Sequence, residues 1–140
     1  MQRLARLLVV AGLVVAGLSL AACSASPDPA GSPKPSVDET TATEMARHAL
    51  EALDAGDYTA WSRDWSPTLR AAIDESAFLA FREQAVTQLG EYVSIEDTVL
   101  TSVKPGTHRW AFTVRFEKAT ATLSFGFVDG RTAIEGVNLG

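Results

Sequence analysis

The chain has 140 residues, of which 46% are hydrophobic, and its 12 Lys plus Arg and 17 Asp plus Glu give a formal net charge of −5. This length suits one domain of ordinary size with a core of its own. The acidic excess disfavours nonspecific nucleic-acid binding, which requires Lys and Arg to neutralise phosphates. A single cysteine leaves no disulfide within the chain, so we expect the fold to be held by its core alone.

The first segment has the layout of a secretory signal peptide. Two arginines precede an apolar run over residues 7–20, which is short for a membrane-spanning stop-transfer helix. The segment Leu20-Ala21-Ala22-Cys23 then resembles a bacterial lipoprotein box. The resemblance implies that the sulfur of Cys23 receives a diacylglycerol and that cleavage makes Cys23 the new amino terminus. The sequence therefore predicts a signal peptide over residues 1–22; an ordinary cleaved signal with a chance cysteine is the alternative.

Lipid on Cys23 would place the mature chain on the extracytoplasmic face of the plasma membrane. If the cell has two membranes, the outer membrane is an alternative location. Two or more acyl chains hold a protein firmly, whereas one does not. The expected partner at this end is therefore membrane lipid, bound through the acylated cysteine.

Residues 23–36 read as a tether. Prolines at positions 27, 29, 33 and 35 block helix and sheet, while Ser and Gly keep the stretch solvated. The remaining residues, 37–140, form one expected domain without internal repeats.

The first half of this domain has helical periodicity. Ser36-Val37-Asp38-Glu39 matches a capping box, which predicts a helix that runs to about Ala55 and stops at Gly56. Asp57 is expected to cap a second, short helix, and Ser66-Pro67 to start a third. A longer helix is expected over residues 75–88, capped by Asp74 and ended by Gly90.

After Gly90 the period changes to the alternation of strands. Strands are expected over residues 92–103, 109–117, 120–127 and 131–139, with a type II turn at Pro105-Gly106 and a hairpin turn at Asp129-Gly130. Gly136 is a candidate bulge. The predicted fold class is α+β, with N-terminal helices on one face of a curved antiparallel sheet of about four strands.

Several turns, caps and core positions in this order resemble a known family. They are Gly56-Asp57-Tyr58, Trp65-Ser66-Pro67, Leu69, Leu89-Gly90-Glu91-Tyr92, Phe116-Glu117-Lys118, Gly130 and Ile134. The pattern resembles the family called domain of unknown function 3887, which is similar to the nuclear-transport-factor-two-like, or cystatin-like, cone. The resemblance implies a curved sheet wrapped on helices with a concave interior, and it implies no reaction. Fold alone does not settle function.

Motifs for metal or nucleophile chemistry are missing from the sequence. The two histidines include His48, four residues after Glu44 on one helix face, but no third ligand is evident and an exposed ion–neutral pair explains them. His108 follows the turn at Pro105-Gly106, and we expect it to be solvated. No nucleophile elbow, phosphate loop or zinc-protease helix occurs. We therefore expect no catalytic residue, no metal and no cofactor.

Two features are candidates for ligand binding. The aromatic residues Tyr58, Trp61 and Trp65 share a helix face and either line a pocket or form core. Arg82 falls within the apolar stripe of the fourth helix. It either points into the cone toward an anionic ligand or lays its stem on apolar surface with its head in water.

Arg109 and Arg115 fall on the wet face of the sheet, which either packs on another copy of the chain or faces solvent.

Three functions follow from these alternatives. The first is a noncatalytic module that binds a small ligand or an envelope protein. The second is an enzyme that uses the cone interior, with Tyr58, Arg82 or an unrecognised acid as a proton-transfer or orienting group. The third is a self-associating, homodimeric spacer.

Overall fold

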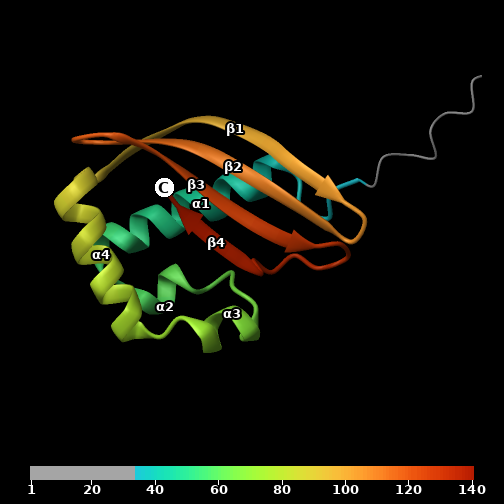
Figure 1. The fold of residues 1–140 in the computed structure, drawn as a ribbon, viewed down its shortest axis with the longest axis horizontal. Helices are drawn as coiled ribbons and strands as arrows, with labels where there is room; N and C mark the ends of the chain where they lie inside the picture. Colours follow the sequence, from blue (N-terminus) through green and yellow to red (C-terminus); the bar gives the residue numbers. More distant parts are fainter. Residues whose placement is uncertain (1–33) are drawn as a thin grey trace, which may run out of the picture. The chain divides into compact units, whose positions relative to one another are not determined.

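The computed structural model describes residues 34–140, so the predicted signal peptide, Cys23 and the tether up to residue 33 lie outside the described residues. The elements follow one another as four helices and then four strands (Figure 1). Their bounds are α1 Glu39–Ala55, α2 Tyr58–Trp61, α3 Pro67–Ala72, α4 Glu75–Leu89, β1 Tyr92–Lys104, β2 Thr107–Phe116, β3 Thr120–Val128 and β4 Gly136–Leu139. The fold is α+β, as predicted, with the helices packed against a four-stranded antiparallel sheet.

Helix α1 begins two residues later than the capping box implied. Asp38, rather than Ser36, is the N-cap, because its Oδ1 accepts the Thr41 N–H at 2.8 Å. That hydrogen bond lowers the pKa of Asp38 below its ordinary value. Ser36 instead donates its hydroxyl to the Arg131 carbonyl at 2.8 Å, which attaches the start of the domain to the β3–β4 loop. The end of α1 is as expected, since Gly56 closes it in the left-handed region with φ 71°.

The caps of the next three helices are those predicted from sequence. The side chains of Asp57, Ser66 and Asp74 accept N–H groups of α2, α3 and α4, respectively, and Pro67 occupies the first turn of α3. Helix α4 then ends at Gly90, whose φ of 82° turns the chain into β1. These caps fix where each helix starts, and so which residues face the sheet.

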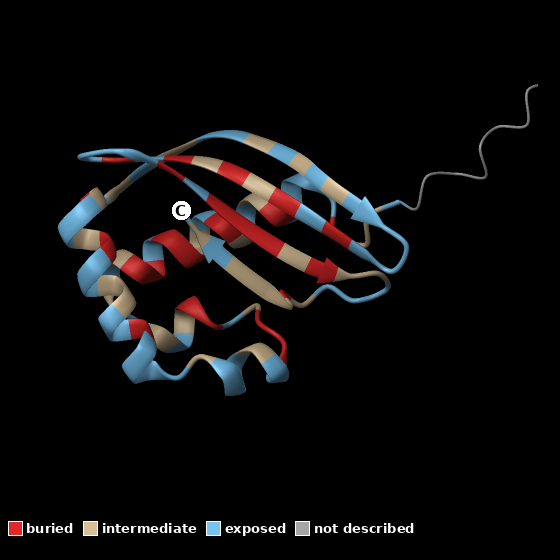
Figure 2. Cartoon of the chain, viewed as in Figure 1, coloured by how far each residue is buried: buried red, intermediate tan, exposed pale blue. Residues whose placement is uncertain are grey.

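The four strands pair in sequence order, which leaves β1 and β4 as the sheet edges. Buried residues alternate with more exposed ones along β2 and, apart from the buried Ser124, along β3, and this alternation gives the sheet one covered face (Figure 2). Its central side chains are Phe112, Val114 and Phe125, all fully buried. The β1–β2 pairing contains three register shifts, which bend β1 over α1. Helix α1 lies on the covered face of the resulting curved sheet (Figure 1).

The last strand is shorter than predicted. The sequence favoured a strand from Arg131 to Leu139, but only Gly136–Leu139 is extended beside β3. The preceding residues leave the sheet because Ile134 pairs with the segment between α2 and α3. Its N–H donates to the Asp64 carbonyl at 2.8 Å, and its carbonyl accepts the Ser66 N–H at 2.9 Å. This long-range bridge buries Ile134. The turn predicted at Asp129-Gly130 is present, with the Arg131 N–H donating to the Val128 carbonyl at 3.0 Å, but the antiparallel strands β3 and β4 are joined by a longer loop than expected.

Across residues 34–140, no helix combines the length and the apolar character needed to span a bilayer.

Candidate ligand-binding site

An apolar cavity of about 240 Å³ opens between the helices and the last two strands. Every helix except α3 contributes to its wall, together with Ile73 from the α3–α4 connection and the ends of β3 and β4. The lining residues are Ala49, Leu50, Leu53, Trp61, Ile73, Phe81, Leu123, Val137, Asn138 and Leu139. None of these side chains is titratable, so the cavity holds no group for acid–base or nucleophilic chemistry.

Trp61 is held in the cavity wall by other aromatic rings. Its ring centroid lies 4.4 Å from that of Trp65, 4.6 Å from Phe78 and 5.9 Å from Phe81. Tilted contacts, as with Trp65 and Phe78, and stacked contacts, as with Phe81, are favourable at these distances beyond the area they bury. The short helix α2 thus presents a fixed indole to the cavity.

The other members of the predicted aromatic face do not line the cavity. Trp65 is buried behind Trp61, with 4% of its surface exposed. The Tyr58 hydroxyl donates to the Ile73 carbonyl at 2.7 Å, which ties α2 to the α3–α4 connection. Each of the two interpretations that the sequence left open therefore applies to part of this aromatic face. Trp61 lines a pocket, while Tyr58 and Trp65 support the wall behind it.

Arg82 has a role that neither sequence interpretation included. Its Nε donates to the Leu53 carbonyl at 2.8 Å and its Nη2 to the Asp54 carbonyl at 2.7 Å. The guanidinium therefore caps the carboxyl end of α1, where unpaired carbonyls favour a cation. It points neither into the cavity nor freely into water, and it joins α4 to α1.

Two ionisable groups beside this cap have shifted pKa values. Partial burial raises the pKa of Asp54, and this effect outweighs the hydrogen bond that its Oδ2 accepts from the Tyr92 N–H at 2.9 Å. Burial, followed by the nearby Glu51 carboxylate, raises the pKa of the Tyr92 hydroxyl. Neither group lines the cavity, so these shifts belong to the joint between α1 and β1.

Arg109 and Arg115 lie on the uncovered face of the sheet, as predicted. Both are exposed. Arg115 Nη1 lies 3.9 Å from Glu96 Oε1, a distance typical of a weak surface ion pair.

The prediction that His108 is solvated is wrong. Its side chain is buried, its Nδ1 lies 3.1 Å from Asp129 Oδ1, and its ring stacks on Phe127 with centroids 5.2 Å apart. The residue follows the turn by one position but already belongs to β2, where it has the inward phase of Trp110. The inward positions of β2 recur every second residue, and continuing this alternation from Trp110 back to position 108 would have predicted a buried His108.

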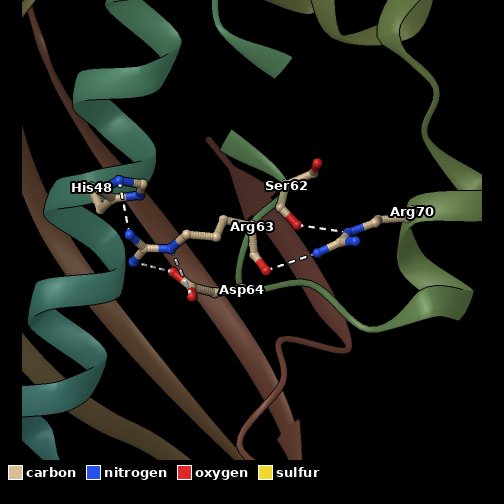
Figure 3. A network of polar contacts seen from close by, with 5 residues as sticks. All are labelled: His48, Ser62, Arg63, Asp64 and Arg70. Atoms are coloured by element: carbon tan, nitrogen blue, oxygen red, sulfur yellow. Dashed lines mark hydrogen bonds and ion pairs between the residues drawn. The ribbon is translucent and has the colours of Figure 1, made fainter. Parts of the chain in front are cut away.

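A polar network fixes the segment between α2 and α3 against α1 (Figure 3). Arg63 Nη1 lies 3.0 Å from His48 Nε2, and since a guanidinium only donates, Nε2 accepts and the ring proton is on Nδ1. Arg63 also pairs with Asp64 at 3.0 Å. Arg70 donates to the carbonyls of Ser62 and Arg63 at 2.9 and 2.8 Å. These bonds hold the element that carries Trp61.

His48 is therefore engaged with Arg63 rather than with Glu44. Within the part of the chain that the structure describes, no three His, Cys, Asp or Glu side chains come together as metal ligands.

Several cavity residues were not singled out from the sequence. Leu123, Val137 and Leu139 come from strands whose register brings them opposite α2 and α4, and Ile73 comes from a connection. Their apolar character showed only that they are core candidates. Contacts between segments about 50 to 90 residues apart in the sequence decide which of these residues line the cavity.

No family model matches this sequence, and no curated protein is significantly similar to it. Among solved structures, the chain is similar to the NMR structure of a protein from Ruminococcus gnavus, with a TM-score of 0.59 and 15% sequence identity. The match covers 76% of this chain and 96% of that chain. At this level of identity the similarity supports the fold alone.

Proposed function

We propose that the protein is a lipid-anchored, noncatalytic envelope module that binds an apolar group in the cavity between α1, α2, α4 and β4. The observation that carries this proposal is the composition of the cavity wall: ten lining residues, none of them titratable. Apolar pockets of this kind are the usual sites of small ligands. The residues that motivated an enzyme, Tyr58 and Arg82, both donate to backbone carbonyls instead.

The cavity volume limits the size of the group that enters. An apolar cavity of about 150 Å³ in another protein stays dry and accepts benzene, whereas drug-sized ligands need roughly 300 Å³ or more. The present cavity, at about 240 Å³, lies between these limits. It suits a bicyclic ring, a branched aliphatic group or one large apolar side chain.

A cavity-filling substitution tests the proposal. Ala49→Phe places a ring into the space beside Trp61, so it should abolish the fluorescence gain of the neutral probe N-phenyl-1-naphthylamine. Ala55→Phe, on the exposed end of the same helix, is the matched control and should bind as the wild type does. Equal probe binding by Ala49→Phe and wild type would contradict the proposal.

The anchor is tested separately. We expect an alkyne-labelled palmitate analogue to be incorporated into the wild-type chain and not into Cys23→Ser. The wild type should fractionate with membranes and Cys23→Ser should not. Label retained in Cys23→Ser, or a wild type that is not membrane-bound, would contradict the lipoprotein assignment while leaving the cavity proposal intact.

A further inference from the structure

The open edge of the sheet borders the cavity. Within residues 34–140, strand β4 pairs only with β3, so its other edge has no strand beside it. Thr122 and Gly140 exchange both backbone hydrogen bonds, at 2.7 and 3.1 Å. In an antiparallel ladder such pairs alternate with residues whose backbone groups point outward. Val137 and Leu139 therefore direct their N–H and C=O groups to the free side, while their side chains face the cavity.

A second hollow continues the cavity along the same edge. It has a volume of about 290 Å³ and shares Phe81 and Leu139 with the first. Its other lining residues are Gln84, Ala85, Gln88, Leu89, Ala121 and Gly140. The two hollows together form a groove between β4 and α4, which we call the β4–α4 groove.

The wall opposite the strand edge also carries hydrogen-bonding groups. Gln84 and Gln88 lie one helical turn apart on α4, and both are exposed. Among residues 34–140, neither amide has a hydrogen-bond partner. No side chain that lines the two hollows is charged. The groove thus has backbone groups on one wall, amides on the other and an apolar floor.

We infer that the natural occupant of the β4–α4 groove is an extended, uncharged peptide segment of another envelope protein, which adds to β4 as a fifth strand. This rests on the function proposed above and names the ligand class. Outward backbone groups at two-residue spacing match the N–H and C=O repeat of a strand. An acyl chain has no such groups along its length. Successive inward side chains of the peptide would enter the two hollows.

The chain's own tether does not fit this role. Residues 27, 29, 33 and 35 are prolines, which have no N–H to donate to the Val137 and Leu139 carbonyls. In the other strand phase the residues bonded to β4 would be those at positions 28, 30, 32 and 34, which are Asp, Ala, Ser and Lys, so no large apolar side chain would enter the hollows. The tether is therefore excluded as the occupant, and we assign the β4–α4 groove to a segment of another chain.

Selection from a random dodecapeptide phage library tests the inference, with the full chain held in phosphatidylcholine nanodiscs as bait. The selected peptides should share a large apolar residue with a second apolar residue two positions away. Leu139→Pro removes the outward N–H at an edge position that tolerates proline. Leu139→Ala keeps that N–H and is the matched control.

Leu139→Pro should weaken binding of a selected peptide about tenfold relative to Leu139→Ala, the effect of one interfacial hydrogen bond. In wild-type protein, the Val137 and Leu139 amides should become protected from hydrogen exchange on peptide binding, which keeps the test valid if the proline variant does not fold.

No selected peptide, or peptides that leave these amides unprotected, would overturn the inference. If N-phenyl-1-naphthylamine still binds in that case, the cavity proposal survives without its peptide. A dimer that Leu139→Pro dissociates would assign the edge to a second copy and equally overturn the inference.

Discussion

At the scale of single residues, Arg82 shows how one side chain joins two helices. Its position within the apolar stripe of α4 was visible in the sequence, but its partners were not, because they are backbone carbonyls 28 and 29 residues away. Sequence periodicity describes which side a residue faces and not which carbonyl lies opposite. For that reason the sequence did not predict that Arg82 caps α1.

Replacement of Arg82 should destabilise the fold without altering ligand binding. Hydrogen bonds to a charged group contribute about 1.5–3 kcal/mol each, and Arg82→Met removes two at one helix end. We expect the free energy of unfolding in urea to fall by at least about 2 kcal/mol. Arg47→Met, on the exposed face of α1, is the control and should change it little. A stable Arg82→Met protein with weakened probe binding would contradict the capping role.

Asp54 should make stability depend on pH. Its folded-state pKa is raised above the ordinary value of 3.8, so its favourable contribution is complete below that value and is lost as pH rises through the folded pKa. Asp54→Asn keeps an acceptor for the Tyr92 N–H but carries no charge at any pH. The variant should therefore gain stability relative to wild type between pH 3 and pH 7 in urea titrations. If the difference in unfolding free energy between Asp54→Asn and wild type were the same at pH 3 and pH 7, burial would not raise the pKa of Asp54.

At the scale of elements, caps and alternation were predictable because they are local. Asp57, Ser66 and Asp74 each lie three residues before the N–H they accept, and β2 alternates over ten residues. The path from Arg131 to Gly136 was not predictable in this way. It is set by the bridge between Ile134 and the α2–α3 segment, about 70 residues earlier in the sequence.

The α4–β1 junction provides an element-scale prediction at Gly90. Its φ of 82° and ψ of −167° belong to a region that is essentially restricted to glycine. A Cβ there would also lie 2.8 Å from that of Glu117. Gly90→Ala should therefore lower the free energy of unfolding by about 2 kcal/mol or more. Gly136→Ala, which meets no atom within 4 Å, is the matched control; equal effects of both changes would contradict this explanation.

At the scale of the whole molecule, the cavity lies between α1, α2, α4 and the strands β3 and β4, and Trp61 forms part of its wall. The fold class followed from the sequence, whereas the cavity required the three-dimensional register of β3 and β4. Only Trp61 among the four predicted ligand contacts lines it. Arg109 and Arg115 stay candidates for an interface on the opposite face.

The cavity volume also predicts how the core responds to a larger side chain. Ala49→Phe should cost little, because its ring enters existing space. Ala52→Phe, on a fully packed side of the same helix, should cost about 1–3 kcal/mol by overpacking. Thermal unfolding of the two variants compares them directly. Equal destabilisation would mean that the hollow beside Ala49 is not available to a ring.

The central claim is that the cavity binds an apolar group, and native mass spectrometry of the protein purified from its own host measures this most directly. The account predicts a discrete added mass on the wild type that is absent from Ala49→Phe and retained by Ala55→Phe. A peptide mass would favour the strand-addition mode. A wild-type protein that carries no added mass and gains none with N-phenyl-1-naphthylamine would contradict the claim.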